Sequence, residues 1–195
     1  MSEPLMVREQ ILDALRRVGK KVFARGKRAD VFVFGGAVMV LAYNARPATR
    51  DVDAVFEPDD EVLTAAHEVA AELGLPRYWL NNQGSSYLSP LRGESNPVIL
   101  DEPGIRVMGA SKELALAMKL GSARREQDFD DIQWLLSELN VATLDQARGI
   151  FARFYPGEQL KDRAALLVED ILDERDTPPK TEGRSPRRGE DGAQR

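Results

Sequence analysis

The order of strand-like and helix-like segments is the strongest constraint on the fold of this chain. Short apolar runs bounded by Gly, Pro, Asn or Asp predict strands, and all of them fall before residue 110. Beyond that point the apolar residues recur at helical spacing up to about residue 173. Strands followed by a run of helices favour an α/β (α+β) fold, with a small mixed sheet flanked by helices and a C-terminal helical lobe.

The same pattern divides the chain into three parts. Residues 1–110 are expected to form the α/β domain, which begins with an N-terminal helix, and residues 111–174 to form the helical lobe. Residues 175–195 contain Pro, Gly and charged residues but almost no apolar ones, which predicts disorder. The predicted strands are 31–34, 51–56, 78–80, 98–100 and 105–108, and the later helices are 111–120, a helix from Asp128 or Asp130 to 139, 143–154 and 160–173.

Composition removes several kinds of catalytic chemistry. The chain has 195 residues and no cysteine, which excludes disulfides, thiol nucleophiles and thiolate metal sites. Its one histidine, His67, is expected to be a structural or surface residue, and an HExxH site is impossible with a single imidazole. Any catalysis must therefore use carboxylates, Lys, Arg, hydroxyl groups and ions that prefer oxygen ligands, such as Mg²⁺.

The charge of the chain is unevenly distributed. The formal net charge is -5, and the last 21 residues hold six Lys+Arg against four Asp+Glu, which leaves -7 for the preceding part. An acidic body argues against a protein that coats DNA generally. No apolar run approaches the roughly 20 residues of a spanning helix, and the N-terminal residues do not resemble a signal peptide. We therefore expect no membrane association and a cytoplasmic location.

A basic stretch near the N-terminus has two interpretations. Its cations either form the solvated face and C-terminal turn of a helix, or contact the phosphate backbone of a nucleic acid. The stretch consists of Arg16, Arg17, Lys20, Lys21, Arg25, Lys27 and Arg28.

A glycine pair and two nearby acids form the most informative pattern. Gly35 and Gly36 follow the predicted strand 31–34, and glycines there allow close approach of the backbone to a ligand and leave amides free for phosphate oxygens. Asp51 and Asp53 are two residues apart on a predicted strand, so their side chains share one face. At an effective dielectric constant of 20, two like charges about 4 Å apart repel by about 4 kcal/mol. The pair therefore predicts a bound cation, and Mg²⁺ fits carboxylates completed by substrate phosphates.

These segments resemble a known family. The stretch GGAVMVLAYNARPATRDVDAVF, residues 35–56, is similar to the first motif of nucleotidyltransferases with the polymerase-β fold, and more narrowly to minimal nucleotidyltransferases of the AbiEii/MenT toxin type. A second similar segment is LALAMKL at 114–120, followed by Arg124 and by DFDDI at 128–132. Residues 79–82, Trp-Leu-Asn-Asn, resemble a W-L-N-D segment of related sequences, with Asn82 where an acid is common. The resemblance covers roughly residues 31–136.

The resemblance implies a role for each matching residue. Gly35 and Gly36 would hold the triphosphate of an NTP substrate, while Asp51 and Asp53 would be catalytic and would bind two Mg²⁺ ions. Such ions, about 3.5–4 Å apart, would activate a hydroxyl group and stabilise the pyrophosphate that leaves.

Five further positions receive roles by the same resemblance. Lys119 would neutralise phosphate charge, and Asp131 would assist catalysis beside it. Thr49, Arg50 and Asp128 would contribute to nucleotide binding. From the residues alone, Lys119 is equally compatible with a lysine whose stem packs in the core, and Asp128 with a helix N-cap.

Two positions carry open alternatives. Polymerase-β-type sites often use a third carboxylate on a later strand, and Asp101 is the candidate metal ligand here, although it also suits a turn. Thr49 lies two residues before Asp51, and toxins of the similar type are silenced at a hydroxyl group in this region. Thr49 is therefore either an ordinary β-branched strand residue or a site of regulatory phosphorylation, which would add negative charge beside the carboxylates.

The function that this resemblance implies is a toxin of a toxin–antitoxin system. It would transfer a nucleoside monophosphate to RNA, at the tRNA 3′ end, and would be inhibited by a cognate antitoxin protein. Two alternatives remain open: nucleotidylation of a protein or small molecule, and a catalytically silent protein of this fold that acts by binding.

Overall fold

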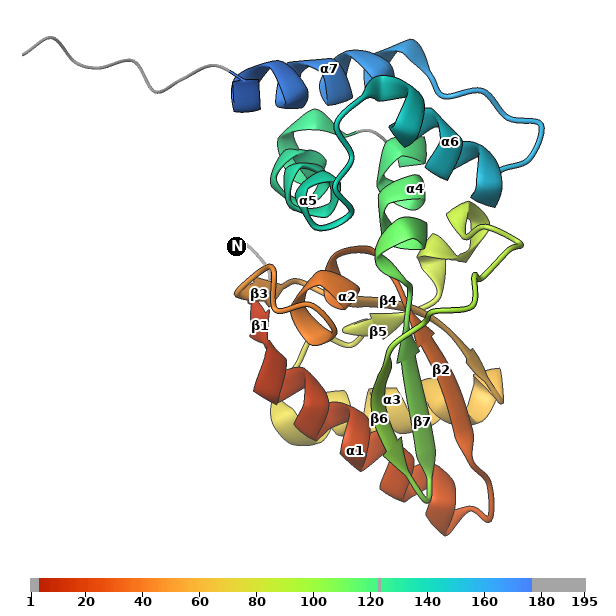
Figure 1. Cartoon of the computed structure of the whole chain (residues 1–195). Helices are drawn as coiled ribbons and strands as arrows, with labels where there is room; N and C mark the ends of the chain where they lie inside the picture. Colours follow the sequence, from red (N-terminus) through yellow and green to blue (C-terminus); the bar gives the residue numbers. More distant parts are fainter. Residues whose placement is uncertain (1–3, 123, 177–195) are drawn as a thin grey trace, which may run out of the picture.

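The computed structural model describes residues 4–122 and 124–176, and it centres on a mixed five-stranded sheet (Figure 1). The strand order is β5-β4-β2-β7-β6. The central strand β2 runs antiparallel to β4 and parallel to β7, while β5 is parallel to β4 and β6 is antiparallel to β7. The five strands are β2 (Ala29–Val33), β4 (Val52–Glu57), β5 (Leu80–Asn81), β6 (Val98–Glu102) and β7 (Ile105–Gly109). All five overlap the predicted strands, and the predicted mixed sheet with flanking helices is confirmed.

One face of this sheet is covered by two helices that pack on each other. They are α1 (Arg8–Ala24) and α3 (Asp59–Leu73), and α3 ends at Gly74, whose φ of 67° gives the left-handed cap typical of glycine. Alternate residues of β2 and β4, such as Val33 and Ala54, are fully buried beneath the helices. The residues between them face the opposite side of the sheet, because successive strand residues point to opposite faces. That second face carries Asp53.

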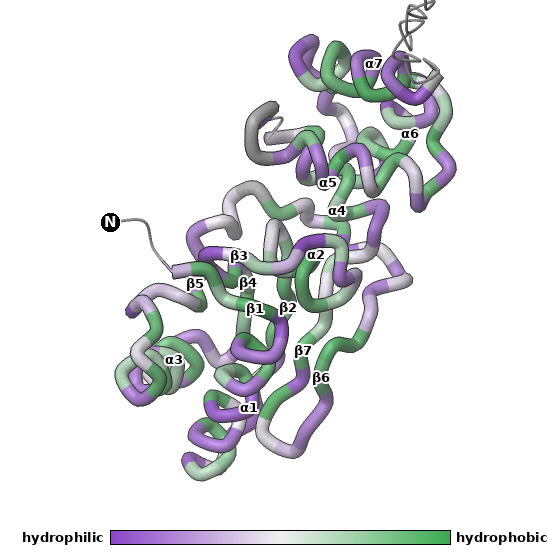
Figure 2. The backbone as a smooth tube through the Cα atoms, turned by 90° about the vertical axis from the view of Figure 1, so that its left-hand side faces the viewer, coloured by the Kyte–Doolittle hydropathy of each residue, from purple (hydrophilic) through white to green (hydrophobic). Residues whose placement is uncertain are grey.

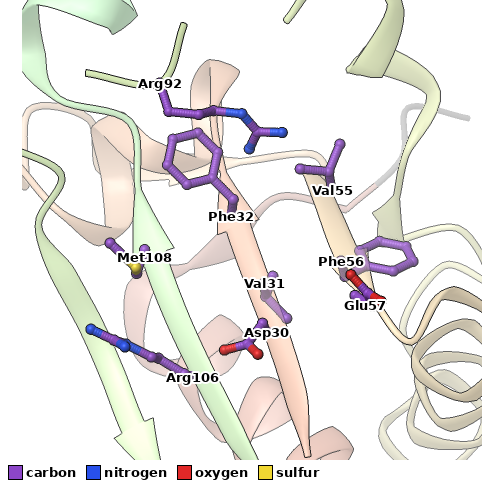
Figure 3. Close-up of a pocket in the computed structure, with 9 residues that line it drawn as sticks. All are labelled: Asp30, Val31, Phe32, Val55, Phe56, Glu57, Arg92, Arg106 and Met108. Atoms are coloured by element: carbon purple, nitrogen blue, oxygen red, sulfur yellow. The ribbon is translucent and has the colours of Figure 1, made fainter. Parts of the chain in front are cut away.

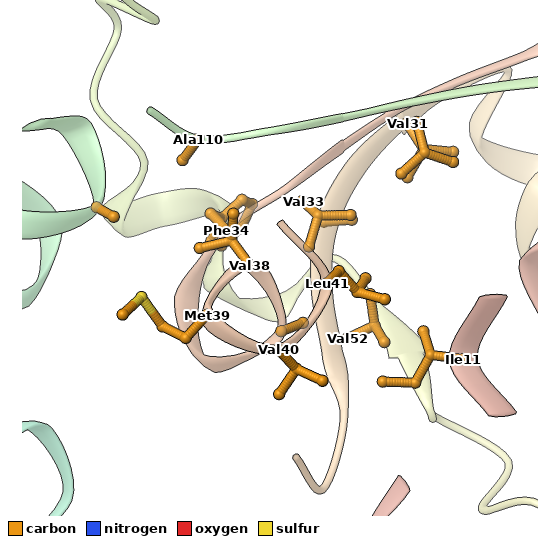
Figure 4. Close-up of a cluster of buried hydrophobic side chains, with 14 of the residues drawn as sticks. Ile11, Val31, Val33, Phe34, Val38, Met39, Val40, Leu41, Val52 and Ala110 are labelled. Carbon is orange, nitrogen blue, oxygen red and sulfur yellow. The ribbon is translucent and has the colours of Figure 1, made fainter. Parts of the chain in front are cut away.

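A short buried helix follows β2. Helix α2 (Gly35–Leu41) contains apolar residues after its two glycines, and it packs among Ile11, Val33 and Val52 (Figure 4). The helix begins at the glycines themselves. Two further strands, β1 (Met6–Val7) and β3 (Ala48–Thr49), form a separate antiparallel ladder that the sequence did not predict.

The four C-terminal helices gather beyond one end of the sheet (Figure 1). Ser111 caps the first of them, since its hydroxyl group accepts a hydrogen bond from the Leu114 amide at 3.2 Å. Helix α5 starts three residues before Asp128, so of the two interpretations of Asp128 the N-cap is wrong. The helices are α4 (Lys112–Ser122), α5 (Arg125–Glu138), α6 (Leu144–Phe154) and α7 (Asp162–Asp176).

The predicted division at about residue 110 falls between β7 and α4. A single cluster of buried apolar side chains extends from Met6 to Ile171, through both the sheet and the helices, so the division into domains stays a prediction. Helix α7 continues through Asp176, so the predicted tail begins two residues too early, and residues 177–195 lie outside the described residues. Hydrophilic and hydrophobic residues alternate along α1 and α7, as in helices with one buried face (Figure 2).

Within residues 4–122 and 124–176, none of the helices combines the length and the apolar character needed to cross a membrane.

Candidate active site

The sheet topology brings the glycine turn, the acid pair and helix α4 to one end of the sheet. Strands β2 and β7 are parallel, so helix α2, which follows β2, and helix α4, which follows β7, both begin at the same end. Strand β4 is antiparallel to β2 and therefore starts there, with Asp51 just before its first residue and Asp53 at its second. The backbone amide of Phe34 donates to the Asp53 carbonyl group at 3.0 Å, which fixes the turn against the strand.

Asp51 and Asp53 influence each other electrostatically. Burial in the first place, and then the negative charge of Asp51, raise the pKa of Asp53 from 3.8 to about 6. The positive charge of Arg124 and a hydrogen bond with Asn81 act in the opposite direction. A pKa held this high shows that the site disfavours the charged form of Asp53 and would gain from a cation beside it. The predicted pairing of the two carboxylates on one face is consistent with this interaction.

Two glycines from different segments enclose the Asp53 carboxylate. A Cβ atom at Gly35, whose φ is 65°, would lie 3.2 Å from one carboxylate oxygen. A Cβ atom at Gly84, in the short 3-10 helix η1 (Gln83–Tyr87), would lie 3.4 Å from the other oxygen and 2.8 Å from the Phe34 ring. A side chain is therefore disfavoured at Gly35, by its positive φ and the nearby carboxylate oxygen, and at Gly84, chiefly by the Phe34 ring. Nothing in the sequence near Gly84 signals this contact, so local pattern alone cannot identify it.

Gly36 makes similar room for two other side chains. A Cβ atom there would lie 3.2 Å from both the Arg46 guanidinium group and the Thr49 hydroxyl group. Thr49 is 7% exposed and donates a hydrogen bond to the Asp51 carbonyl oxygen at 3.2 Å. The space beside both glycines of the turn is thus used by protein side chains, and their predicted contact with a triphosphate stays a prediction. Arg50 lies exposed between β3 and β4.

Lys119 forms the centre of a buried charge cluster. Its ammonium group lies 2.7 Å from Asp131 and 2.9 Å from Asp128, and the three side chains are 7%, 3% and 2% exposed. Asp131 also pairs with Arg46 at 3.2 Å, and Arg46 lies against Gly36. This cluster ties α4 and α5 to the loop before the acid pair. Three predicted site residues are brought together, but Lys119 is already neutralised by two carboxylates.

Asp128 connects this cluster to the acid pair through Arg124. Its second oxygen accepts hydrogen bonds from the Ser122 hydroxyl group at 3.0 Å and from the Arg124 amide at 3.2 Å. Burial tends to raise the pKa of Asp128, but Lys119, Arg124 and Ser122 together outweigh burial and lower that pKa. The Arg124 side chain is 64% exposed and acts electrostatically on Asp53. Arg46, beside Gly36, and Arg124, near enough to act on Asp53, are thus two cations that border the glycine turn and the acid pair.

Asp101 is not brought to this site. It lies on β6, at the far edge of the sheet, and pairs in register with Arg106 of β7. Its carboxylate forms ion pairs with Arg28 and, at 3.8 Å, with Arg106. The position follows from the hairpin, which places Asp101 level with Glu57, the last residue of β4. Asp101 is therefore removed from the candidate metal ligands.

Asn81 takes the position beside Asp53 that a third acid could occupy. Strand β5 pairs with β4 so that Asn81 lies opposite Asp53, whereas the next residue, Asn82, turns its amide toward Asp59 at 3.4 Å. The resemblance to W-L-N-D segments points to Asn82, but the strand register places Asn81 beside Asp53. Only the pairing of β4 with β5 could reveal this, since the two strands are separated by the whole of α3.

The donor set of the site suits a hard cation. Asp51 and Asp53 offer carboxylate oxygens, and Mg²⁺ is commonly held by one or two carboxylates together with substrate phosphates and water. Across the residues that the structure describes, no group of three or more His, Cys, Asp or Glu side chains is arranged to hold a metal ion. The residues therefore fit an ion that the substrate helps to bind, rather than a site built wholly from protein.

The basic stretch near the N-terminus is neutralised within the molecule, on the helix that covers the other face of the sheet. This arrangement favours the interpretation as a solvated helix face over that of a nucleic-acid surface. Six of its seven cations form ion pairs: Arg16 with Glu102, Arg17 with Asp13, Lys21 with Glu68 and Glu72, Arg25 with Glu68, Lys27 with Glu61, and Arg28 with Asp101.

A mixed sheet with an acid pair facing a glycine turn defines a nucleotidyltransferase-like protein. The chain belongs to the family described as "Nucleotidyltransferase of unknown function (DUF6036)", whose model matches residues 10–151. Searches of curated proteins and of solved structures gave no match. The family supports the nucleotidyltransferase part of the resemblance noted in the sequence, and its description names no acceptor, metal or toxin activity.

Proposed function

We propose that this protein is a Mg²⁺-dependent nucleotidyltransferase that transfers a nucleoside monophosphate from an NTP to a hydroxyl group of RNA, with the tRNA 3′ end as acceptor. The observation that carries the proposal is the pair Asp51 and Asp53 at the start of β4, where burial and mutual repulsion raise the pKa of Asp53 to about 6. Carboxylates kept in such a position are stabilised by a divalent cation, which a triphosphate brings with it.

Asp51 and Asp53 would hold the metal ions. Mg²⁺ bound there would supply charge neutralisation for the triphosphate and would make the acceptor hydroxyl group a better nucleophile. The chain itself positions the Asp53 carboxylate, which fits between Gly35 and Gly84 because neither residue has a side chain. Nucleotidyl transfer depends largely on such positioning and on electrostatic stabilisation.

Arg46 and Arg124 are the cations that we assign to the triphosphate. Each is held by an acid of the buried cluster, Arg46 by Asp131 at 3.2 Å and Arg124 by Asp128 at 3.4 Å. Lys119 fixes both acids, so it positions the two arginines rather than touching phosphate itself. This assignment departs from the role that the resemblance implied for Lys119, because its side chain is 7% exposed.

The test is incubation of the protein with total RNA, Mg²⁺ and each labelled nucleoside triphosphate in turn. Wild-type protein is expected to label RNA, and EDTA or the substitution Asp51→Ala is expected to reduce labelling to background without loss of the folded state by circular dichroism. Asp101→Ala is the matched control, because it removes an acid of the same sheet that lies away from the pair. An active Asp51→Ala protein would refute the assignment.

The distribution of the label separates the remaining alternatives. Label in a protein or in a small molecule instead of RNA would favour nucleotidylation of those acceptors. Absence of Mg²⁺-dependent triphosphate binding by equilibrium dialysis would favour a catalytically silent binding protein.

The toxin–antitoxin part of the proposal rests on the resemblance of the sequence, and Thr49 is its regulatory site. The Thr49 hydroxyl group is engaged with the Asp51 carbonyl oxygen, and Thr49 pairs with Met6 in the β1–β3 ladder. Phosphorylation would therefore require this small ladder to open, and the added charge would then lie beside the acid pair. The mass of the intact protein, expressed with and without the neighbouring gene products, tests this: an unmodified Thr49 under silencing conditions would count against it.

A further inference from the structure

A pocket lies on the sheet face that α1 and α3 leave uncovered. Its volume is about 340 Å³, within the range of small-ligand sites. The apolar floor consists of Val55, Phe32 and Met108, which are register partners across β4, β2 and β7 and therefore form one row (Figure 3). The candidate active site described above does not include this hollow, which has an apolar floor and charged residues around it.

This pocket adjoins the acid pair. Asp53, Val55 and Glu57 alternate along β4 and share one face, so the row containing Val55 lies about 7 Å from Asp53 along the strand. A molecule resting on Phe32 and Val55 can therefore present a hydroxyl group to a phosphate held at Asp51 and Asp53. The pocket is placed where an acceptor must bind if the proposed function is correct.

A guanidinium group covers the aromatic ring in the pocket. Arg92, from the loop between η1 and β6, lies over Phe32 with its guanidinium carbon 4.7 Å from the ring centroid (Figure 3). Burial lowers the pKa of Arg92. In the described parts of the chain Arg92 forms no ion pair with a carboxylate, so its donors remain available to an anionic ligand. An arginine fork matches the geometry of a phosphate group.

The charges of the pocket select among acceptors. A second row of register partners lies two residues along the strands, on the side away from Asp53. In it, Asp30 is the partner of both Glu57 and Arg106. With Arg92, the lining carries two acids and two bases, and the cation lies over the aromatic ring. This balance does not suit a polycationic small molecule. A planar base that stacks on a ring, with a phosphodiester beside it, matches both the aromatic and the arginine.

We propose that this pocket is the acceptor subsite and that it takes the terminal nucleoside of a single-stranded RNA end, with the base replacing the guanidinium group of the exposed Arg92 over Phe32 and Arg92 turning to the adjacent phosphodiester. The inference rests on the proposed function. In the transfer, the terminal hydroxyl oxygen forms a bond to the α-phosphorus of the NTP, the bond from that phosphorus to the bridging oxygen breaks, pyrophosphate leaves, and the hydroxyl proton passes to water.

The test measures binding without requiring turnover. The probe is a short, 5′-fluorescent oligoribonucleotide ending in CCA, compared with the same oligonucleotide whose last residue lacks its base but keeps ribose and phosphate. Fluorescence anisotropy is expected to show wild-type protein binding the intact end at least about fivefold more tightly than the abasic end, since one base stacked on an aromatic ring contributes about 1–3 kcal/mol. The variant Phe32→Leu, which keeps an apolar side chain, is expected to lose this preference, and Arg92→Ala is expected to weaken both probes equally.

Matched controls come from a second arginine–aromatic pair. Arg77 lies over Tyr78 at 5.8 Å, and Tyr78 packs against His67 of α3 on the covered side, so Tyr78→Leu and Arg77→Ala are expected to leave RNA binding unchanged. Equal affinity of wild-type protein for intact and abasic ends, or a preference that survives Phe32→Leu, would overturn the proposal. Mg²⁺-dependent triphosphate binding, measured separately on the same proteins, tests the proposed function. If wild-type protein binds no triphosphate, the transferase function is contradicted. If it binds triphosphate but not the RNA end, only the acceptor subsite is contradicted.

Discussion

The ammonium nitrogen of Lys119 lies 2.7 Å from a carboxylate oxygen of Asp131, in a part of the molecule where neither side chain is more than 7% exposed. Because a second carboxylate, Asp128, lies 2.9 Å from the same nitrogen, Lys119 holds together two helices and, through Asp131, the Arg46 loop. Removal of a buried charge leaves its partners uncompensated, which costs much more than the loss of an exposed pair.

We predict that Lys119→Met lowers the free energy of unfolding by about 3–5 kcal/mol, measured by urea denaturation at pH 7. Lys112→Met is the matched control, because Lys112 also projects from α4 and pairs with an acid of α5, Glu138, at 2.7 Å, but both side chains are about one-third exposed or more. Its effect is expected to stay below about 2 kcal/mol, since the exposed ion pair and the contacts of Lys112 with the Tyr43 and Trp134 rings are each weak. Similar losses for the two variants would contradict the structural role assigned to the cluster.

The pKa of Asp53 predicts a pH-dependent cost in the absence of metal. The pKa is about 6 in the folded protein and 3.8 in the reference state, so the folded state binds more protons between these values and loses stability as the pH rises through that window. Asp53→Asn removes this loss. In EDTA we expect the Tm of Asp53→Asn to equal that of wild type near pH 4 and to exceed it by a few degrees above pH 7. The underlying difference in the free energy of unfolding is about 1 kcal/mol after allowance for solvent screening. A Tm difference that does not change with pH would be inconsistent with this account.

A comparison of substitutions at Gly35 and Gly74 distinguishes the effect of backbone strain from the effect of a side chain placed beside Asp53. Their φ values are 65° and 67°, but a Cβ atom at Gly35 would lie 3.2 Å from Asp53, whereas at Gly74 nothing lies within 4 Å. Both Gly35→Ala and Gly74→Ala are expected to lower the free energy of unfolding by about 1–2 kcal/mol, because a side chain is disfavoured at positive φ. Only Gly35→Ala is expected to weaken Mg²⁺-dependent triphosphate binding, by about tenfold or more. Equal triphosphate affinity in the two variants would show that the contact between Gly35 and Asp53 is unimportant.

Asn81 offers a gain-of-function test of the metal site. Asn81→Asp would place a third carboxylate opposite Asp53, so we expect a lower Tm in EDTA and a larger rise in Tm on addition of Mg²⁺ than in wild type. Asn82→Asp adds the same charge one residue later, toward Asp59, and is expected to give the wild-type response to Mg²⁺. A greater Mg²⁺ response in Asn82→Asp than in Asn81→Asp would move the metal site away from Asp53.

The sequence predicted the parts of the fold that depend on local pattern. Alternation from Val52 to Phe56 indicated which face of β4 carries Asp53, and Ser111 marked the start of α4, because both signals lie within a few residues of the feature they specify. The start of α5 was misplaced because Asp128 suits an N-cap, whereas tertiary contacts with Lys119 and Ser122 hold it inside the first turns.

Contacts between distant segments could not be predicted in the same way. Gly84 and Asn81 reach Asp53 only because β5 pairs with β4 in one register, and no local pattern encodes that register. Asp101 followed an apolar strand and so resembled a metal ligand, but the strand order carries it to the opposite edge. The basic stretch was ambiguous because its acidic partners come from α3, from the β6–β7 hairpin and from α1 itself.

The two faces of strand β4 have different roles, so the strand does not tolerate insertions or deletions. Within Val52–Glu57, the buried residues Val52, Ala54 and Phe56 alternate with Asp53, Val55 and Glu57, which share the opposite face. Insertion or deletion of a single residue within β4 would rotate Asp53 into the packed interior and expose Ala54 in its place. Sequence variation within β4 is therefore expected to consist of substitutions. Insertions and deletions in homologous sequences are expected in the flanking loops.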